Sequence, residues 1–168
     1  MTNAVVQQAL SRLDAGAPPW KTLVVLASAE TDLLPAAIWQ TWSEIEEWPS
    51  MSSRVLGARW TKGQPWRAGS EFTQELDLGF PFGTRFFDER VVAIEPGISA
   101  EWGQTSRALQ TIHLWRFEPR DTSGTRITNV EVFHGFTVGV AGAMVAPRWR
   151  RHFQEHVDEL IKTAKENS

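Results

Sequence analysis

The 168-residue sequence contains no cysteine and no tyrosine. Without cysteine there can be no disulfide bond, thiolate metal ligand or cysteine nucleophile, and this composition is compatible with a cytoplasmic protein. Without tyrosine no phenol can serve as an acid in a binding pocket. No apolar run approaches the ~18 residues of a membrane-spanning helix, and the N-terminal segment lacks the basic and continuous apolar regions of a secretory signal. We therefore expect a cytoplasmic protein without stable membrane insertion.

An excess of positive charge is also missing, because 17 lysines and arginines stand against 20 acidic residues, for a net charge of −3. A nucleic-acid-binding surface normally needs many lysines and arginines on one face. The densest basic segment, "PRWRRH" (147–152), is typical of the solvated first turn of a helix. We therefore expect no nucleic-acid partner.

Large apolar rings are what the sequence has in abundance, with nine tryptophans and nine phenylalanines. Such rings can fill a core, stack on bases, grip a sugar or line an apolar pocket. The length fits one domain with a sizeable core. We expect residues 1–20 to form an N-terminal extension, with a short amphipathic helix pattern near its start, and residues 21–168 to form a single ligand-binding domain.

Seven segments have the composition and alternation of β-strands and are separated by turn signals. Short connections between them imply antiparallel neighbours. Pro35 fits the first turn of a helix that follows the first strand, and Pro49 stops a second short helix before the second strand. The predicted strands are residues 22–31, 54–61, 70–78, 84–95, 98–104, 108–118 and 126–135.

Residues 137–166 have the pattern of a long C-terminal helix, which Pro147 should kink or restart. An apolar stripe on this helix predicts that it packs against a sheet, with Phe153 and Leu160 buried there. The predicted fold class is α+β: a curved seven-stranded antiparallel sheet wrapped around a long C-terminal helix, with two short helices between strands one and two.

Seven short pieces occur in an order and spacing that resemble a known superfamily. They are "PAAIW" (35–39), "EEWPSM" (46–51), "AGSEF" (68–72), "RVVAIEPG" (90–97), "HLWRFEP" (113–119), "SGTRIT" (123–128) and "VEVFHG" (130–135). The chain resembles the START-related helix-grip superfamily, SRPBCC, and in particular its polyketide cyclase/dehydrase branch. The resemblance implies a deep cavity between the concave sheet face and the C-terminal helix, in which members bind apolar molecules. Some members catalyse aldol cyclisation and dehydration, but the superfamily has no universal catalytic motif.

His113 and Glu131 form the most interesting polar pair, because they lie on two consecutive predicted strands. If the connecting turn centres near Thr122, the two residues are almost directly opposite each other. A histidine beside a carboxylate can act as a general acid or base near neutral pH. The same pair could instead make a structural hydrogen bond, and a register slip of one residue would point Glu131 outward.

The cavity implied by the resemblance needs apolar walls and a mouth. Trp102 and Trp115 are the best wall candidates, whereas Trp39 and Trp48 are more typical of scaffold. Arg85 either meets an acidic ligand group at the mouth or is a solvated turn residue, and "GFPFG" (79–83) forms either a lip or ordinary packing. The predicted ligand-binding residues are Phe72, Leu76, Arg85, Phe87, Trp102, Trp115, Phe133 and Met144.

"HFQEH" (152–156) formally matches the H-x-x-E-H zinc motif. A third protein ligand is missing downstream, and Phe153 belongs to the apolar stripe, so we interpret the match as chance and expect no metal. No nucleotide-binding or serine-hydrolase motif is present, and we expect no cofactor.

The sequence thus predicts a protein that binds an apolar or aromatic small molecule in an internal cavity. Cyclisation or dehydration of a polyketide-like substrate, with His113 and Glu131 as acid and base, is the catalytic interpretation. The alternative is a non-catalytic carrier of lipid-like ligands or a module that binds a protein partner. The oligomeric state is not determined by the sequence.

Overall fold

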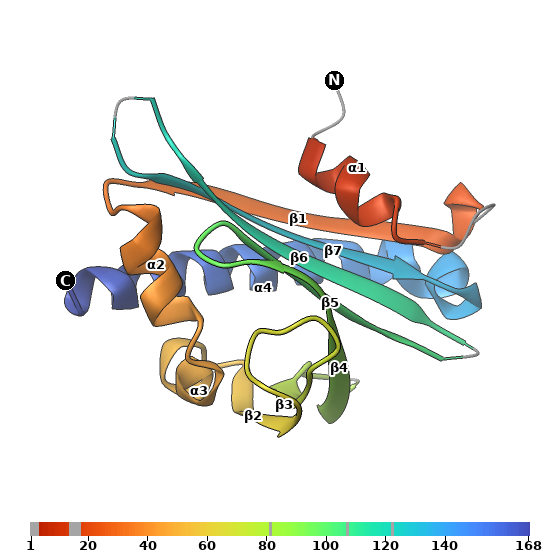
Figure 1. The fold of residues 1–168 in the computed structure, drawn as a ribbon. Coiled ribbons are helices and arrows are strands. Elements are labelled where there is room, and N and C mark those ends of the chain that lie inside the picture. Colours follow the sequence, from red (N-terminus) through yellow and green to blue (C-terminus); the bar gives the residue numbers. More distant parts are fainter. Residues whose placement is uncertain (1–3, 14–17, 81, 107, 122) are drawn as a thin grey trace.

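The computed structural model describes residues 4–13, 18–80, 82–106, 108–121 and 123–168. Its helices and strands follow one another in the predicted order (Figure 1). They are α1 (Ala4–Leu10), β1 (Thr22–Thr31), α2 (Pro35–Trp42), α3 (Trp48–Met51), β2 (Val55–Lys62), β3 (Glu71–Asp77), β4 (Thr84–Glu95), β5 (Ser99–Thr105), β6 (Gln110–Pro119), β7 (Thr125–His134) and α4 (Phe136–Glu166), with 3₁₀ turns at Pro19–Lys21 and Ile45–Glu47.

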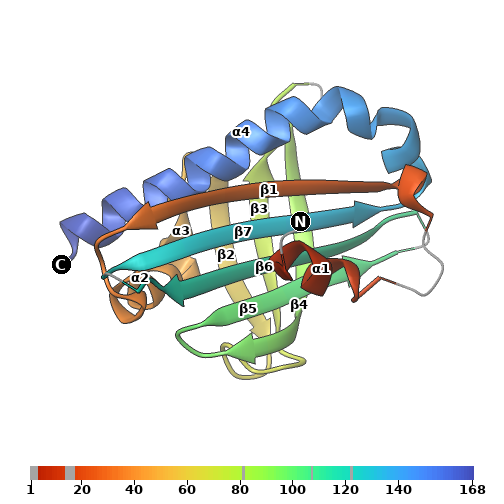
Figure 2. The ribbon, with the colours of Figure 1, turned by 90° about the horizontal axis from the view of Figure 1, so that it is seen from above.

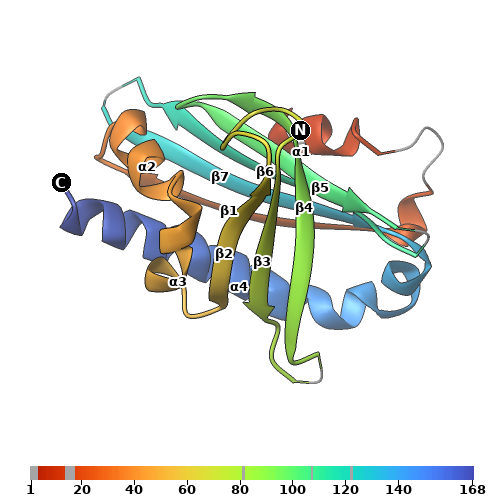
Figure 3. The same ribbon diagram turned by 60° about the horizontal axis from the view of Figure 1, so that its bottom comes forward.

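The seven strands form one antiparallel sheet in the order β1-β7-β6-β5-β4-β3-β2. Irregular pairing between β4 and β5 and between β2 and β3 accompanies a strong bend, as bulges increase local twist. Figure 3 shows β2, β3 and β4 turned across the direction of β1, β6 and β7. The predicted helix-grip architecture, including the two short helices between β1 and β2, is confirmed. Pro49, however, lies in the first turn of α3 and does not end it, because a proline is tolerated where the helix has no partner for its N–H.

Helix α4 lies along the sheet and is continuous through Pro147. Of the two predicted effects of this proline, a kink or a restart, the restart does not occur; the first turns of the helix bend away from the remainder (Figure 2). Leu160 and Val157 are fully buried, as the apolar stripe predicted, but Phe153 is only half-buried. Within the part of the chain that the structure describes, no helix is long and apolar enough to cross a membrane.

Most of the tryptophans form a core at the end of the sheet covered by α2 and α3. The Trp42 ring lies 4.6 Å from that of Trp66 and 5.3 Å from that of Phe117, between ring centroids. The indole N–H of Trp48 donates to the carbonyl of Trp42 at 2.7 Å, and that of Trp66 donates to Ser43 at the same distance. The tryptophan-rich segment therefore closes one end of the molecule.

The convex face of the sheet carries a second, smaller apolar cluster beneath α1 (Figure 2). Helix α1 contributes Val6 and Ala9, which pack with Ile112, Leu114 and Val130 of β6 and β7. The helix expected near the N-terminus is therefore present and covers the outer face, while residues 1–3 and 14–17 of the predicted extension lie outside the described part. Strands β6 and β7 consequently bury side chains on both faces.

Candidate functional site

A cavity of about 380 Å³ lies between the concave face of the sheet and α4. Most of its surface is apolar, and the exposed side chains of Arg85 and Phe86 in its lining mark the mouth. Successive residues of a strand point to opposite faces, so β5, β6 and β7 supply alternate residues to the lining, such as His113 and Trp115 of β6. The polar lining residues away from the mouth are Ser52, Gln74, Glu89, Gln104, Thr111, His113, Asn129, Glu131 and His156.

His113 of β6 and Glu131 of β7 are paired directly across the two strands. Both line the cavity, and their side chains keep 13% and 14% of their surface exposed. The Nδ1 atom of His113 lies 3.8 Å from Oε2 of Glu131, which is too long for a direct hydrogen bond. Thr122, at which the turn was expected to centre, lies outside the described residues.

The protonation of this pair is governed by its apolar surroundings. Burial lowers the pKa of His113 to about 3, against the opposing effect of its hydrogen bond with Asn129, and His156 lowers it further. Burial also raises the pKa of Glu131 well above its ordinary value, and the neighbouring Glu89 adds to this rise. At neutral pH the imidazole and the carboxyl are therefore both uncharged, so the pair is not a salt bridge.

The imidazole of His113 is held by contacts on several sides. Its Nε2 lies 2.6 Å from Oδ1 of Asn129, and its ring centroid lies 4.5 Å from that of Trp102 and 5.3 Å from that of Phe153. Because Oδ1 can only accept, Nε2 carries the hydrogen. The lone pair of His113 Nδ1 is then left on the side of Glu131, so the geometry provides a neutral base next to a protonated acid.

Glu89 is a second carboxyl in the cavity lining, and only 4% of its surface is exposed. Gln74 Nε2 lies 3.5 Å from its Oε1, while its Oε2 has no hydrogen-bond partner among the described residues. Burial raises the pKa of Glu89 to about 7; the bond from Gln74 opposes this rise and Asp88 adds slightly to it. Glu89 therefore titrates near neutral pH.

Six of the eight predicted ligand-binding residues line the cavity: Leu76, Arg85, Phe87, Trp102, Trp115 and Phe133. Arg85 is exposed, and its guanidinium donates to the carbonyl of Thr84 at 2.8 Å. Of the "GFPFG" segment, Phe82 lines the cavity and Phe80 is exposed, while Pro81 lies outside the described residues.

Phe72 and Met144 are the two predicted residues that the structure does not bring to the cavity. Phe72 is buried in the tryptophan core, with its ring 5.4 Å from Trp60 and 5.9 Å from Trp48. Met144 lies on the outward side of α4 and is 81% exposed. The first error arises because the strand bends, so one face of β3 serves both the core and the cavity. The second arises because Met144 lies on the same outward side of α4 as the exposed Arg151 and Asp158, away from the buried stripe.

Sequence reasoning did not select several residues that do line the cavity, above all Glu89, Asn129 and His156. Alternation from Phe87 would have placed Glu89 on the inner face. Because Glu89 stands between Asp88 and Arg90, however, its sequence context is typical of a solvent-exposed residue. Trp48, expected to be scaffold, both supports the core and contributes to the lining. Phe153 packs on His113 of the sheet, as predicted, and also lines the cavity.

The "HFQEH" segment directs both of its histidines toward the cavity. Burial lowers the pKa of His156 to about 4, and its ring meets that of Trp115 edge-on at 5.2 Å. Among the described residues, no three histidine or acidic side chains converge in a way that could hold a metal ion.

Known proteins support this architecture. A hypothetical protein from Helicobacter pylori has a TM-score of 0.74 at 16% identity, over 98% of both chains. The Zhui aromatase/cyclase from Streptomyces has a TM-score of 0.66 at 9% identity, over 86% of this chain and 94% of its own. The di-domain ARO/CYC StfQ from the steffimycin biosynthetic pathway has a TM-score of 0.69 at 12% identity, over 88% of this chain and 52% of its own.

No curated protein matches the chain significantly by sequence. Residues 22–165, however, match the family described as polyketide cyclase/dehydrase and lipid transport. This confirms the resemblance inferred from the order of the short sequence pieces. The chain belongs to the polyketide cyclase/dehydrase and lipid transport family.

Proposed function

We propose that the protein binds an apolar or aromatic small molecule in its cavity and catalyses cyclisation or dehydration of a polyketide-like substrate. The observation that carries this proposal is the location of a neutral imidazole, His113, and a protonated carboxyl, Glu131, on the wall of one largely apolar cavity. The family, and neighbours named as aromatase/cyclases, support the same class of reaction.

The chemistry requires one proton to leave a carbon next to a carbonyl while another reaches an oxygen. His113 Nδ1 accepts the carbon-bound proton, and Glu131 gives its proton to the carbonyl oxygen, which yields a neutral enol. The enol carbon then attacks a second carbonyl; the enol hydroxyl gives up its proton as its carbonyl re-forms, and the new alkoxide takes up that proton to become the aldol hydroxyl. In the dehydration step, the pair again removes the proton next to the carbonyl and protonates the departing hydroxyl, which leaves as water.

A base with a strongly lowered pKa is a poor proton acceptor when it acts alone. Here the donor and the acceptor exchange protons together, so the charges that form are an imidazolium and a carboxylate 3.8 Å apart. Opposite charges at this distance stabilise each other strongly in apolar surroundings. Proton transfer from His113 back to Glu131 then restores the starting state.

The carrier alternative is favoured by one observation, the apolar character of most of the lining. A carrier needs affinity but no proton transfer. The two functions therefore make the same prediction for binding and different predictions for proton exchange.

The test measures deuterium incorporation next to the carbonyl of acetonaphthone, an apolar aryl ketone, in heavy water. His113→Ala should lower the protein-catalysed rate by ~10²–10⁴, while quenching of tryptophan fluorescence shows that the ketone still binds. His134→Ala is the matched control, because His134 lies on β7 outside the cavity lining and hydrogen-bonds with Thr22. The exchange rate of this control variant should equal that of the wild type.

Equal exchange rates in the wild type and His113→Ala would remove the catalytic role and leave the carrier. Failure of every apolar probe to bind would contradict both functions.

A further inference from the structure

The titratable and charged residues that line the cavity are Arg54, Asp77, Arg85, Glu89, His113, Glu131, His152 and His156. The two arginines have other partners: Arg54 lies 3.6 Å from the carboxylate of Asp77, and Arg85 bonds the Thr84 carbonyl. Burial lowers the pKa of each of the three histidines. At neutral pH the interior of the cavity therefore holds carboxyl groups without a cation of the protein's own.

Of the carboxyls in the cavity lining, Glu89 has an oxygen atom without a hydrogen-bond partner among the described residues. Its Oε2 is buried and has no partner among the described residues, although Glu89 belongs to the lining. Glu131 lies close enough that Glu89 raises its pKa. Two carboxyls in an apolar space repel each other when ionised, and a cation placed between or beside them would remove that cost.

The same cavity has aromatic rings in its lining, among them Trp48, Trp102, Trp115 and Phe153. Faces of aromatic rings attract an organic cation, and tryptophan does so most strongly. An acidic ligand would find no such attraction at Glu89, because its carboxylate would have to lose water beside another carboxyl.

We propose that the cavity selects an apolar ligand that carries a protonated amine, with Glu89 as the group that receives the ammonium and the surrounding rings as its apolar walls. This inference rests on the proposed binding of an apolar molecule in the cavity, and it adds the ligand's charged end. A ligand of the same shape that ends in a carboxylate is rejected.

The binding should depend on pH in a defined direction. Glu89 must be ionised to pair with the ammonium, and its pKa in the empty cavity is about 7. Affinity for the amine therefore rises as the pH increases through about 7, until the amine itself loses its proton. A neutral ligand of the same shape shows no such rise.

The test uses three probes with one ring system: naphthylmethylamine, naphthalenemethanol and naphthoic acid. Their affinities are measured by calorimetry and tryptophan quenching at pH ~6 and pH ~8. At the higher pH, the amine should bind ~10-fold or more tightly than the alcohol, and the acid ~10-fold or more weakly, as expected for a charge-assisted hydrogen bond.

Glu89→Gln should abolish the advantage of the amine and leave the affinity for the alcohol unchanged. Asp88→Asn is the matched control, because Asp88 is the exposed neighbour on the same strand and points to the other face. In this control variant the amine should keep its advantage. Circular dichroism and the alcohol's affinity report whether each variant is folded.

Equal affinities for the amine and the alcohol would overturn this inference and leave the proposed function intact. An amine advantage that survives Glu89→Gln would overturn the assignment to Glu89. If none of the three probes binds, the proposed function itself fails together with the inference.

Discussion

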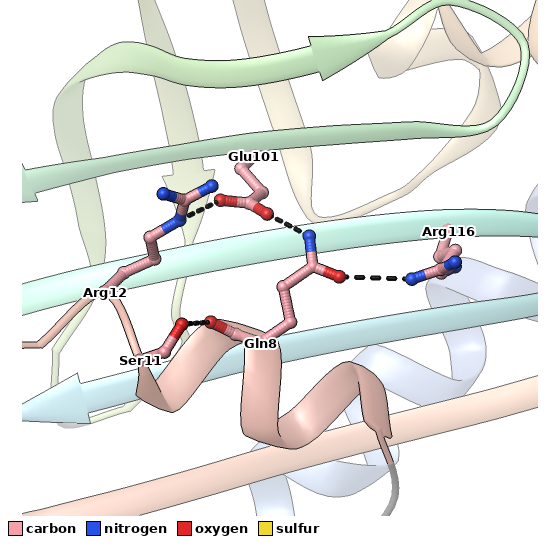
Figure 4. A network of polar contacts seen from close by, with 5 residues as sticks. All are labelled: Gln8, Ser11, Arg12, Glu101 and Arg116. Carbon is pink, nitrogen blue, oxygen red and sulfur yellow. Dashed lines mark hydrogen bonds and ion pairs between the residues drawn. The ribbon is translucent and has the colours of Figure 1, made fainter.

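Glu101 and Glu131 are both buried glutamates of the same sheet, but they face opposite sides of it and have different partners. Glu101, on the outer face, is only 1% exposed. Arg12 Nε donates to it at 2.7 Å, and Gln8 of α1 donates to its other oxygen (Figure 4). Arg116 in turn donates to Gln8 at 3.1 Å. On the inner face, no arginine or lysine of the described residues forms an ion pair with Glu131.

The difference follows from the cost of burying a charge. A buried carboxylate is tolerated when a cation and hydrogen-bond donors accompany it, and otherwise it takes up a proton. On the outer face the chain supplies the cation just after α1, so Glu101 anchors that helix. On the inner face burial raises the pKa of Glu131 well above normal. The cavity thus keeps a carboxyl in its acid form, and perturbed groups of this kind are typical of functional sites.

The sharpest test of this comparison makes the same small change on each face. Glu131→Gln should lower deuterium exchange into acetonaphthone by ~10²–10⁴, because the amide has no acidic proton to give. Glu101→Gln should leave the exchange rate unchanged. An equal loss of rate in both variants would mean that the effect comes from the fold and not from the acid.

A second test concerns the packing of α4 against the inner, concave face of the sheet. Leu160→Ala should lower the free energy of unfolding by ~2–5 kcal/mol, because Leu160 is fully buried between α4 and the sheet and the change leaves a hole. Urea unfolding measures the loss, with the exposed Lys162→Ala on the same helix as control. A loss below ~1 kcal/mol would show that α4 is not seated on the sheet.

The fold could be predicted from the sequence because its signals are local. Alternation marked the strands, and turn residues between them implied antiparallel neighbours; the observed bounds differ from the predicted ones by at most two residues. The pairing of His113 with Glu131 also followed, because a hairpin register depends on a short connection. Pro147 was expected to kink or restart α4, and the local pattern left open which of the two occurs; the helix stays continuous.

The site was predictable only in part, because a cavity depends on how far the sheet bends. The alternation of β3 placed Phe72 and Leu76 on one face, but the bend assigns Phe72 to the core and Leu76 to the cavity. Glu89 could not be recognised as buried from its neighbours Asp88 and Arg90, which are exposed. The protonation of His113 and Glu131 also depends on how deeply each side chain is buried, and alternation along a strand gives only the face and not the depth.

The dependence of stability on pH should also separate the two faces. The pKa of Glu89 rises from 4.5 to about 7 on folding, so the folded state binds this proton more tightly than the unfolded state. The stability that this group contributes is present below pH 4.5 and is lost as the pH rises through 7. Glu89→Gln should therefore be more stable than the wild type at pH ~8, by up to about 3 kcal/mol, and nearly equal to it at pH ~4.

Urea unfolding at several pH values measures this difference. Asp88→Asn serves as the control, since Asp88 is exposed and should show little change. The lowered pKa values of His113 and His156 act in the other direction, because their contribution is lost as the pH falls below 6.5. Comparing Glu89→Gln with the wild type at each pH cancels that background. A difference that does not grow between pH ~4 and pH ~8 would contradict the protonated state assigned to Glu89.

The smallest expected effect belongs to the partnered glutamate of the outer face. Arg12→Ala removes the cation beside Glu101, and the loss of one partner from a buried ion pair costs ~3–5 kcal/mol. The Arg12 side chain is 41% exposed, however, so water already weakens the attraction and can reach the carboxylate once the arginine is gone. We therefore expect a loss of ~1–2 kcal/mol in urea unfolding, faster amide exchange in α1, and unchanged affinity of the cavity for naphthalenemethanol.

Combining Arg12→Ala with Glu101→Gln isolates the interaction between the two side chains. If the arginine stabilises the carboxylate, the double variant should lose less than the sum of the two single losses, because the second change removes a charge that the first has already left unpaired. Lys162→Ala, an exposed change on α4 outside this network, provides the control, since it should add independently to either change. Strictly additive losses for Arg12 and Glu101 would mean that the outer carboxylate does not need its cation. The difference between Glu101, paired with arginine, and Glu131, which keeps its proton, would then have to come from their different hydration alone.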